Sequence, residues 1–399
     1  MRLPSRHPHR KAHRRLVACA TAMLATTGLL AACSGDDTAS PRVKAATTTR
    51  PATPIVLNGE GNNLDAYAMS PEGAFTHHRV DTNNDQNPKG WDINAQLCVF
   101  ERDGKRLLIA GEDTHQPNPP PGWGIFELNG NGLDALTVKR VAKLTPTFQP
   151  TSSDNPENYG CGVLGDGRIL TTDVGQQATG DDGQLIIWFP PYDGFGEGDI
   201  SYCKLDVALP TAQSILVTDS DRFLVAAARG GVYQYTGPFP TDATPAGGCD
   251  GKDATGRPTA TKVTKKTLVA PGEAGMATPA GLAPAPDGGF YASSVFTGVI
   301  NEYGANGTFR RNILPAPPGE SIGATPLSTG TPLGLGTDAE GNIWYADIGL
   351  VLDPKSGMGP GDHTGTLRVI RFANGQPQAP VTVATGLDFP DGIGTVATS

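Results

Sequence analysis

The segment Pro332-Leu-Gly-Leu-Gly-Thr-Asp-Ala-Glu-Gly341, followed by the apolar run at 343–346, indicates the architecture of this 399-residue chain. A short apolar strand, a turn containing glycine and a second apolar strand form the pattern of a β-hairpin. Similar segments, which align with this one, begin at Ala95, Asn158, Ala212, Pro279 and Pro390. A hairpin that recurs in this way predicts a fold made of repeated units.

The spacing of these segments predicts the size of each unit. The aligned apolar position falls at residues 98, 161, 215, 282, 335 and 393, so the spacings are 63, 54, 67, 53 and 58 residues. Each spacing accommodates four strands with their loops, so we predict an all-β, six-bladed β-propeller. The sixth segment has no strands after it, and segments 53–57, 64–69 and 75–81 are predicted to complete that blade. A β-sandwich and a solenoid of hairpins are the alternatives.

The N-terminus has the pattern of an export signal. Six cations between Arg2 and Arg15 precede an apolar run at 16–30, which is too short for a membrane span. The run ends in Leu30-Ala31-Ala32-Cys33, which resembles the bacterial lipobox. We therefore predict a signal peptide at 1–32 and a lipid on Cys33, diacylglycerol with palmitate-type chains. An ordinary signal peptide with an incidental cysteine is the alternative, and the export route, Sec or twin-arginine, stays open.

Composition divides the remainder into a tether and a domain. Residues 33–54 have almost no large apolar side chains and are predicted to be disordered, whereas 55–399 form the propeller. Without the six signal-peptide cations the net charge is 25 − 40 = −15, which argues against nucleic-acid binding. The predicted location is the extracytoplasmic face of the cell membrane. The partners are the membrane, through the lipid, and an unknown small molecule, glycan or protein.

Four cysteines remain after the signal peptide is removed and Cys33 is acylated. Cys98 and Cys161 occupy the same aligned position of neighbouring inner strands, so we predict a disulfide between them. Cys203 and Cys249 then pair by elimination, as an even count in an exported protein indicates. Buried free thiols are the alternative.

Propeller topology predicts where a site would form. The residues that open each inner strand meet the loops that join the second and third strands, because both lie on the same face of the ring. Two of these loops, 112–123 and 349–364, are long and should frame Asp391; long loops on a rigid scaffold often carry function. The predicted ligand-binding residues at this channel mouth are Gln96, Asn158, Tyr159, Gln213, Arg229 and Asp391.

Two segments also resemble a known family. Thr331-Pro-Leu-Gly-Leu-Gly-Thr-Asp-Ala-Glu-Gly-Asn-Ile-Trp-Tyr-Ala-Asp347 and Pro279-Ala-Gly-Leu resemble inner hairpins of the SMP-30/gluconolactonase/LRE-like propellers, which share motifs with NHL-repeat proteins. The resemblance implies a calcium-type ion in the channel and hydrolysis of a lactone. This chain has Ala280 and Leu333 at two of the family's ligand positions and Gln96 in place of its glutamate. Asp391 alone retains a ligand-type side chain, so the sequence assigns no cofactor and leaves calcium open.

Two functions follow from these observations. The first is a ligand- or partner-binding module that lacks the usual metal ligands. The alternative is a divergent lactone or ester hydrolase, with Asp391, His115, Asp173 and Asp347 as its candidate catalytic residues. Two weaker patterns are a site formed by His115 with His363 near Asp391, and a calcium loop beginning at Asp81 that lacks the usual glycine and glutamate.

Overall fold

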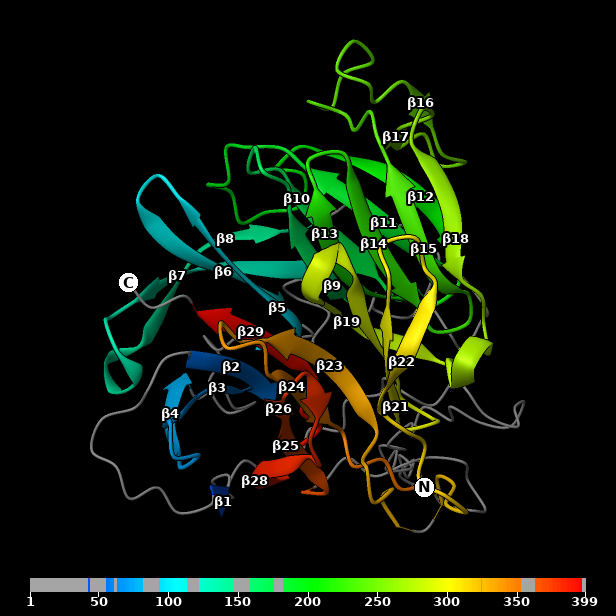
Figure 1. Ribbon diagram of the computed structural model, residues 1–399. Helices are drawn as coiled ribbons and strands as arrows, with labels where there is room; N and C mark the ends of the chain where they lie inside the picture. The colour runs from blue at the N-terminus through cyan, green and yellow to red at the C-terminus, as the bar shows by residue number, and fades with distance from the viewer. Residues whose placement is uncertain are drawn as a thin grey trace, which may run out of the picture.

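The protein is a six-bladed β-propeller, as predicted (Figure 1). The computed structural model describes residues 42–43, 55–60, 63–81, 93–112, 122–145, 158–175, 182–323, 325–352 and 363–396. Apart from strands, these residues form three single 3₁₀ turns, η1 (Leu133–Ala135), η2 (Glu273–Gly275) and η3 (Pro286–Gly288). Within the same residues, no helix has the length and apolar character needed to cross a membrane.

Five blades are continuous in sequence, and each is an antiparallel sheet whose first strand is innermost. Blade 1 contains β5 (Ile93–Arg102), β6 (Lys105–Glu112), β7 (Gly122–Asn129) and β8 (Thr137–Leu144). Blade 2 contains β9 (Asn158–Val163), β10 (Ile169–Asp173), β11 (Gly183–Trp188) and β12 (Tyr202–Leu209). Blade 3 contains β13 (Ala212–Asp219), β14 (Arg222–Ala227), β15 (Gly231–Thr236) and β18 (Thr264–Val269). Blade 4 contains β19 (Pro279–Pro284), β20 (Phe290–Ser294), β21 (Val299–Tyr303) and β22 (Phe309–Leu314). Blade 5 contains β23 (Pro332–Thr337), β24 (Ile343–Asp347), β25 (Gly365–Ile370) and β28 (Val381–Leu387).

Blade 6 joins the two ends of the described chain. Its inner strand is β29 (Gly392–Val396), and its outer strands are β2 (Ile55–Glu60), β3 (Asn63–Met69) and β4 (Phe75–Asp81). The red β29 lies beside the blue β2 in Figure 1, and the two strands pair over their whole length, from Ile55 with Val396 to Gly59 with Gly392. The predicted closure by N-terminal strands is therefore confirmed.

Glycines allow the inner strands to approach one another closely. The inner strands contact in the order β5, β9, β13, β19, β23, β29, and β29 contacts β5. In four blades the residue before the aligned apolar position is glycine, and a Cβ there would collide with a backbone carbonyl of the next inner strand. These glycines are Gly160, Gly281, Gly334 and Gly392. The repeat contains glycine at this point because the narrow ring has no room for a side chain.

Apolar side chains fill the spaces between blades. Among the described residues, six clusters of buried apolar side chains each lie between two neighbouring blades, and a seventh lies on the axis. The cluster between blades 1 and 2 includes Trp123 and Trp188, with ring centroids 6.3 Å apart. Burial of this kind contributes roughly 25 cal/mol per Å² of apolar surface and holds the blades together.

Two short additions extend the outer edges of blades. An insertion from blade 3, containing β16 (Gly251–Lys252) and β17 (Pro258–Thr259), joins blade 2 through parallel pairing of β17 with β12 and projects at the top of Figure 1. Within segment 33–54, β1 (Arg42–Val43) pairs with β28 on blade 5, and the tether itself stays a prediction. The rest of the tether and Cys33 lie outside the described residues.

A small hairpin of β26 (Phe372–Ala373) and β27 (Gln376–Pro377) lies in blade 5.

Both predicted disulfides are confirmed. Cys98 and Cys161 join the inner strands of blades 1 and 2, with their Cα atoms 6.0 Å apart. Cys203 and Cys249 join blade 2 to the insertion from blade 3, also with a Cα separation of 6.0 Å. Beside the second disulfide, the buried Lys204 ammonium lies 2.6 Å from the Asp253 carboxylate, so a covalent and an ionic contact together hold the insertion on blade 2.

Candidate functional site

The axis of the propeller has two different ends. We call the end where the inner strands begin the start end, and the end where the hairpins lead from each inner strand to the second strand the hairpin end. The sequence predicts a site at the start end. In the structure, this end is filled by the axial apolar cluster, whose buried members are Ala95, Tyr159, Val174, Ala280, Val295, Leu333, Ile348 and Leu350.

Asp391 and Tyr159 are both buried at the start end. The backbone N–H of Ala95 donates to Oδ2 of Asp391 at 2.7 Å, and this bond joins blade 6 to blade 1. Ala95 has a φ of 64°, a left-handed conformation that is unfavourable for alanine, so the Asp391 carboxylate stabilises a strained turn at the opening of β5. Burial and the negative charge of Asp391 raise the pKa of Tyr159 well above its usual value.

Asp347 is surrounded by donors. Its Oδ1 accepts hydrogen bonds from the backbone N–H groups of Thr331 and Gly349, at 2.7 and 2.9 Å. Its Oδ2 accepts a hydrogen bond from the hydroxyl of Thr366 at 2.9 Å and lies 3.0 Å from the guanidinium of Arg368. Through these contacts the Asp347 carboxylate, which is 1% exposed, fixes the loop after β24.

Asp173 lies at the end of β10 and is also buried. Burial raises its pKa to about 7, although a hydrogen bond from the Gly175 N–H and the charge of Lys204 act in the opposite direction. The Gly175 N–H donates to Oδ1 at 3.0 Å. A carboxyl group with this pKa is protonated in a large fraction of molecules near neutral pH.

The other predicted ligand-binding residues at this end have structural contacts. The Asn158 side chain donates to the carbonyl oxygen of Gly122 in blade 1 at 2.8 Å. Gln213 is 2% exposed, and its backbone carbonyl accepts a hydrogen bond from the hydroxyl of Thr172 at 2.6 Å. Arg229 is exposed on blade 3, where its Nε donates to the hydroxyl of Thr211 at 2.7 Å. Ligand binding by these residues stays a prediction.

The histidine pair is only partly described. His115 lies outside the described residues, as do most of loops 112–123 and 349–364. Nδ1 of His363 lies 3.0 Å from the carboxylate of Asp388. The catalytic roles proposed for His115, Asp173, Asp347 and Asp391 therefore stay predictions.

The described part of the start end does not fit a calcium-type ion. Ala280 and Leu333, at two of the family's ligand positions, are buried in the axial apolar cluster. One oxygen of Asp391 already accepts a backbone hydrogen bond. Within the described ranges, no three His, Cys, Asp or Glu side chains are grouped as metal ligands. A hard cation needs several oxygen ligands, which these residues do not supply.

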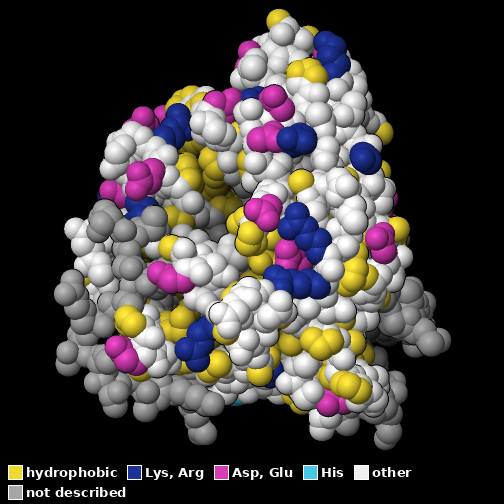
Figure 2. Space-filling view, viewed as in Figure 1, with side chains coloured by type: hydrophobic (Ala, Val, Ile, Leu, Met, Phe, Trp, Pro, Cys, Tyr) yellow, Lys and Arg dark blue, Asp and Glu magenta, His cyan; other side chains and the backbone are white. Residues whose placement is uncertain are grey.

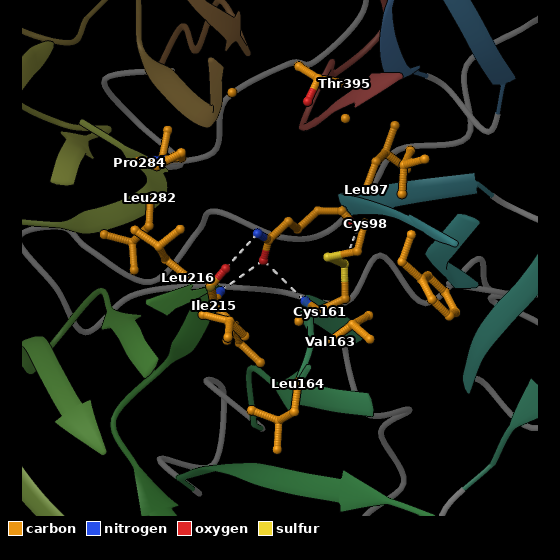
Figure 3. Close-up of a pocket in the computed structure, with 18 of the residues that line it drawn as sticks. Leu97, Cys98, Cys161, Val163, Leu164, Ile215, Leu216, Leu282, Pro284 and Thr395 are labelled. Atoms are coloured by element: carbon orange, nitrogen blue, oxygen red, sulfur yellow. Dashed lines mark hydrogen bonds between the residues drawn. A yellow bond between two sulfur atoms is a disulfide. The ribbon is translucent and has the colours of Figure 1, made fainter. Parts of the chain in front are cut away.

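The hairpin end contains a cavity of about 740 Å³. All six inner strands line it, from Gln96 at its inner limit to the hairpins of blades 1 and 2 at its mouth. Figure 2 shows this face hollowed, with apolar side chains on the walls. In Figure 3, side chains from inner strands of different blades, including Leu97, Leu216, Leu282 and Thr395, surround the shared space. We call this space the axial cavity.

Gln96 crosses the axis and forms the inner limit of the axial cavity. Its Nε2 donates to the Ile215 carbonyl at 2.8 Å. Its Oε1 accepts from the backbone N–H groups of Cys161 and Ile215, at 3.1 and 2.8 Å, and dashed lines mark these bonds in Figure 3. The side chain thereby joins blade 1 to blades 2 and 3. The Cys98–Cys161 disulfide lines the cavity wall beside it.

Charged groups at the axial cavity lie at its mouth. Glu101, Arg102 and Asp103 belong to the first hairpin of blade 1, and Asp166 to that of blade 2. The Arg102 guanidinium lies 5.0 Å from the centre of the Tyr192 ring, a cation–π contact that positions it beside the mouth. Although partial burial acts in the opposite direction, hydrogen bonds and charge from Arg168 lower the pKa of Asp166. The mouth therefore carries charges of both signs.

Sequence reasoning did not find the axial cavity. Except for Gln96 and Leu97, the residues on its walls lie at and after the aligned apolar position, whereas the predicted site residues open the inner strands or lie in loops at the start end. Small residues follow that position in blades 2, 4, 5 and 6, namely Gly162, Ala283, Gly336 and Gly394. A Cβ at Gly162, Gly336 or Gly394 would lie within 3 Å of a side-chain atom of the next inner strand, so these glycines allow the inner strands to pack closely.

Comparison with known proteins gives a similar fold and no family. No protein-family model matches the chain, and no curated protein matches it significantly. Among solved structures, the chain is similar to the calcium-binding protein regucalcin from Agrobacterium tumefaciens, with 12% identity, coverage of 88% of this chain and 95% of that one, and a TM-score of 0.44. It is also similar to a luciferin-regenerating enzyme, with 12% identity, coverage of 87% and 100%, and a TM-score of 0.45. Virginiamycin B lyase from Staphylococcus aureus is also similar, with 11% identity, coverage of 83% of this chain and 80% of that one, and a TM-score of 0.40. Similarity at this level assigns no activity to this chain.

Proposed function

We propose that the protein is a binding module that holds a small neutral ligand in the axial cavity. The observation that carries this proposal is the cavity of about 740 Å³ at the hairpin end. Its volume lies within the range of about 300–1,000 Å³ that is typical of small-molecule sites. Apolar side chains, the hydroxyl groups of Thr337 and Thr395 and the backbone of the inner strands form the walls, and the charged lining residues are at the mouth, which favours a neutral ligand.

The test is to fill the axial cavity. Thr337 lies half-buried on its wall, and Thr337→Trp places an indole in the space. A panel of neutral apolar fragments is titrated into the full-length protein by calorimetry. We expect binding to the unchanged protein and at least about a tenfold loss of affinity in the variant. The matched control is Thr267→Trp on the exposed outer strand β18, which should bind normally. Equal binding by both variants would place the site elsewhere.

The alternative is a divergent lactone or ester hydrolase. The observation that favours it is the pKa of Asp173, about 7, which suits a general base near neutral pH. It predicts turnover of a lactone or ester panel that is lost in Asp391→Ala. Turnover that Thr337→Trp leaves unchanged would support this alternative over the binding module.

The lipid anchor is part of the same proposal. The sequence around Cys33 supports it, and the acidic net charge indicates that acyl chains, rather than attraction to anionic lipid, hold the protein at the membrane. Cells grown with labelled palmitate should incorporate label into the protein and retain it in the membrane fraction. Cys33→Ala should lose both properties, and a variant that keeps the label would show that Cys33 is not the acylated residue.

A further inference from the structure

The contacts of the Gln96 side chain show which chemical group the inner strands can bind. Its carboxamide is bound entirely by backbone groups: two N–H groups, from Cys161 and Ile215, donate to its oxygen, and the Ile215 carbonyl accepts from its nitrogen. These groups lie on the inward edges of β9 and β13, which face the axis and are not paired with another strand of their sheets. Blades 2 and 3 therefore form a binding site for a primary amide, and blade 1 supplies its occupant.

The sheet registers indicate that the other blades present the same edge. Cys161 and Ile215 pair with Thr171 and Val225 on their second strands. At the aligned position of the remaining blades, Leu282 pairs with Ala292, Leu335 with Tyr345, and Ile393 with Asn58. In an antiparallel pair, every second residue directs its N–H and C=O away from its partner strand. The aligned residues of blades 4 to 6 therefore direct these groups to the axis, as Cys161 and Ile215 do.

A proline in blade 4 supports this assignment independently. Pro284 lies two residues after Leu282 and ends β19, where it pairs with Phe290. Proline has no N–H, so it fits in a strand where that group would point out of the sheet rather than to the next strand. Residues two apart in a strand direct their backbone groups to the same side. The N–H and C=O groups of Leu282 therefore face the axial cavity, as the nitrogen of Pro284 does.

The edges of blades 4 to 6 have no occupant comparable to Gln96. Among the hydrogen bonds of the described residues, none joins a side chain to the backbone of Leu282, Leu335 or Ile393. Buried backbone donors and acceptors need partners, from water or from a ligand. The wall on this side also carries the hydroxyl side chains of Thr337 and Thr395.

We propose that this half of the axial cavity binds the amide group of a ligand with an apolar body, such as a short apolar peptide. An amide offers a donor and an acceptor together, as the Gln96 side chain does, and the apolar side chains around the space, such as Leu97 and Leu216, receive the rest of the ligand. The proposal rests on the proposed binding function and names the class of its ligand. An ester of the same shape has the acceptor and lacks the donor.

The test compares an amide with its ester isostere. N-acetyl-leucine-N-methylamide and methyl 2-acetoxy-4-methylpentanoate, which replaces both amides by esters, are titrated into the full-length protein by calorimetry. We expect the diamide to bind at least about tenfold more tightly than the diester. Thr395→Trp, on the wall of blade 6, should abolish binding, and Thr267→Trp should leave it unchanged.

The outcomes separate this inference from the proposed function. If diamide and diester bind with equal affinity, and Thr395→Trp weakens both, the axial cavity binds ligands without recognising amides. If neither probe binds, and the neutral fragment panel also fails, both proposals are wrong.

A second experiment examines the existing amide site. Gln96→Ala leaves three backbone groups of blades 2 and 3 without their partner, and acetamide can replace the missing side chain. We expect acetamide to raise the Tm of Gln96→Ala relative to Gln378→Ala, whose glutamine is exposed on blade 5. Methyl acetate should not do so. Equal effects of acetamide on both variants would overturn the assignment of these edges as amide sites.

Discussion

The start end and the hairpin end of the axis are built from the same six strands, yet one is filled and the other is hollow. At the start end, the loops after the second strands of blades 2, 4 and 5 direct Val174, Val295 and Ile348 into the axial apolar cluster. At the hairpin end, all six inner strands line the axial cavity, which stays open. Carboxylates at the filled end support the ring, whereas strand edges at the hollow end line the axial cavity.

Asp347→Ala should give the largest effect, because it removes a carboxylate with contacts to β25 and to its own loop. The variant leaves the Arg368 guanidinium and several N–H and O–H donors without their acceptor. We expect the free energy of unfolding in urea to fall by about 3–5 kcal/mol. Asp166→Ala at the hairpin end removes a carboxylate that is 55% exposed, and Arg168 keeps the carbonyl oxygens of Phe239 and Pro240 as acceptors, so the variant should cost less than about 1 kcal/mol. Similar losses in both variants would contradict the division between the two ends.

Asp173 should make stability depend on pH. Its folded-state pKa is about 7, above the unfolded value of about 3.9, so the folded state binds the proton more tightly. This stabilisation is fully present below about pH 4 and is lost as the pH rises through about 7. Asp173→Asn cannot titrate, and above pH 7 it should be more stable than the unchanged protein by roughly 1–2 kcal/mol. Parallel stability curves for the two proteins between pH 4 and 8 would refute a raised pKa at this residue.

Tyr159→Phe should give the smallest effect. The Tyr159 hydroxyl is buried and has no hydrogen-bond partner among the described residues. Removing it should change the free energy of unfolding by between zero and about +1 kcal/mol, in the stabilising direction. Tyr235→Phe is the matched control, because that hydroxyl donates to Asp206 at 2.7 Å, and its loss should destabilise the protein by about 1–2 kcal/mol. Loss of ligand affinity in Tyr159→Phe would instead support the sequence-based site at the start end.

The repeat allowed most of the fold to be predicted. Hairpin turns and alternating apolar residues are local signals, so the six inner strands could be located without knowledge of tertiary contacts. Equivalence between repeats also predicted the Cys98–Cys161 disulfide, because residues at the same position of neighbouring inner strands lie close together. The missing strands of the last repeat predicted the closure of blade 6.

The end of the axis that is hollow could not be predicted in the same way. The alignment of the repeats places Asp391 and Tyr159 at the same end of the axis. It does not show that Val174 and Ile348 fold over the same point and exclude water. The role of Gln96 was likewise hidden, because its side chain crosses the axis to a strand 119 residues later in the chain. Both features depend on side chains from several blades meeting at the centre of the ring.

The composition of blade 6 also affects the timing of folding. Its outer strand β2 is synthesised before the other five blades, and its inner strand β29 after them. Joining segments more than 300 residues apart has an entropic cost of about 5 kcal/mol, which pairing and packing must offset. During synthesis the five complete blades therefore form at most an open arc. The ring therefore stays open until β29 has been made.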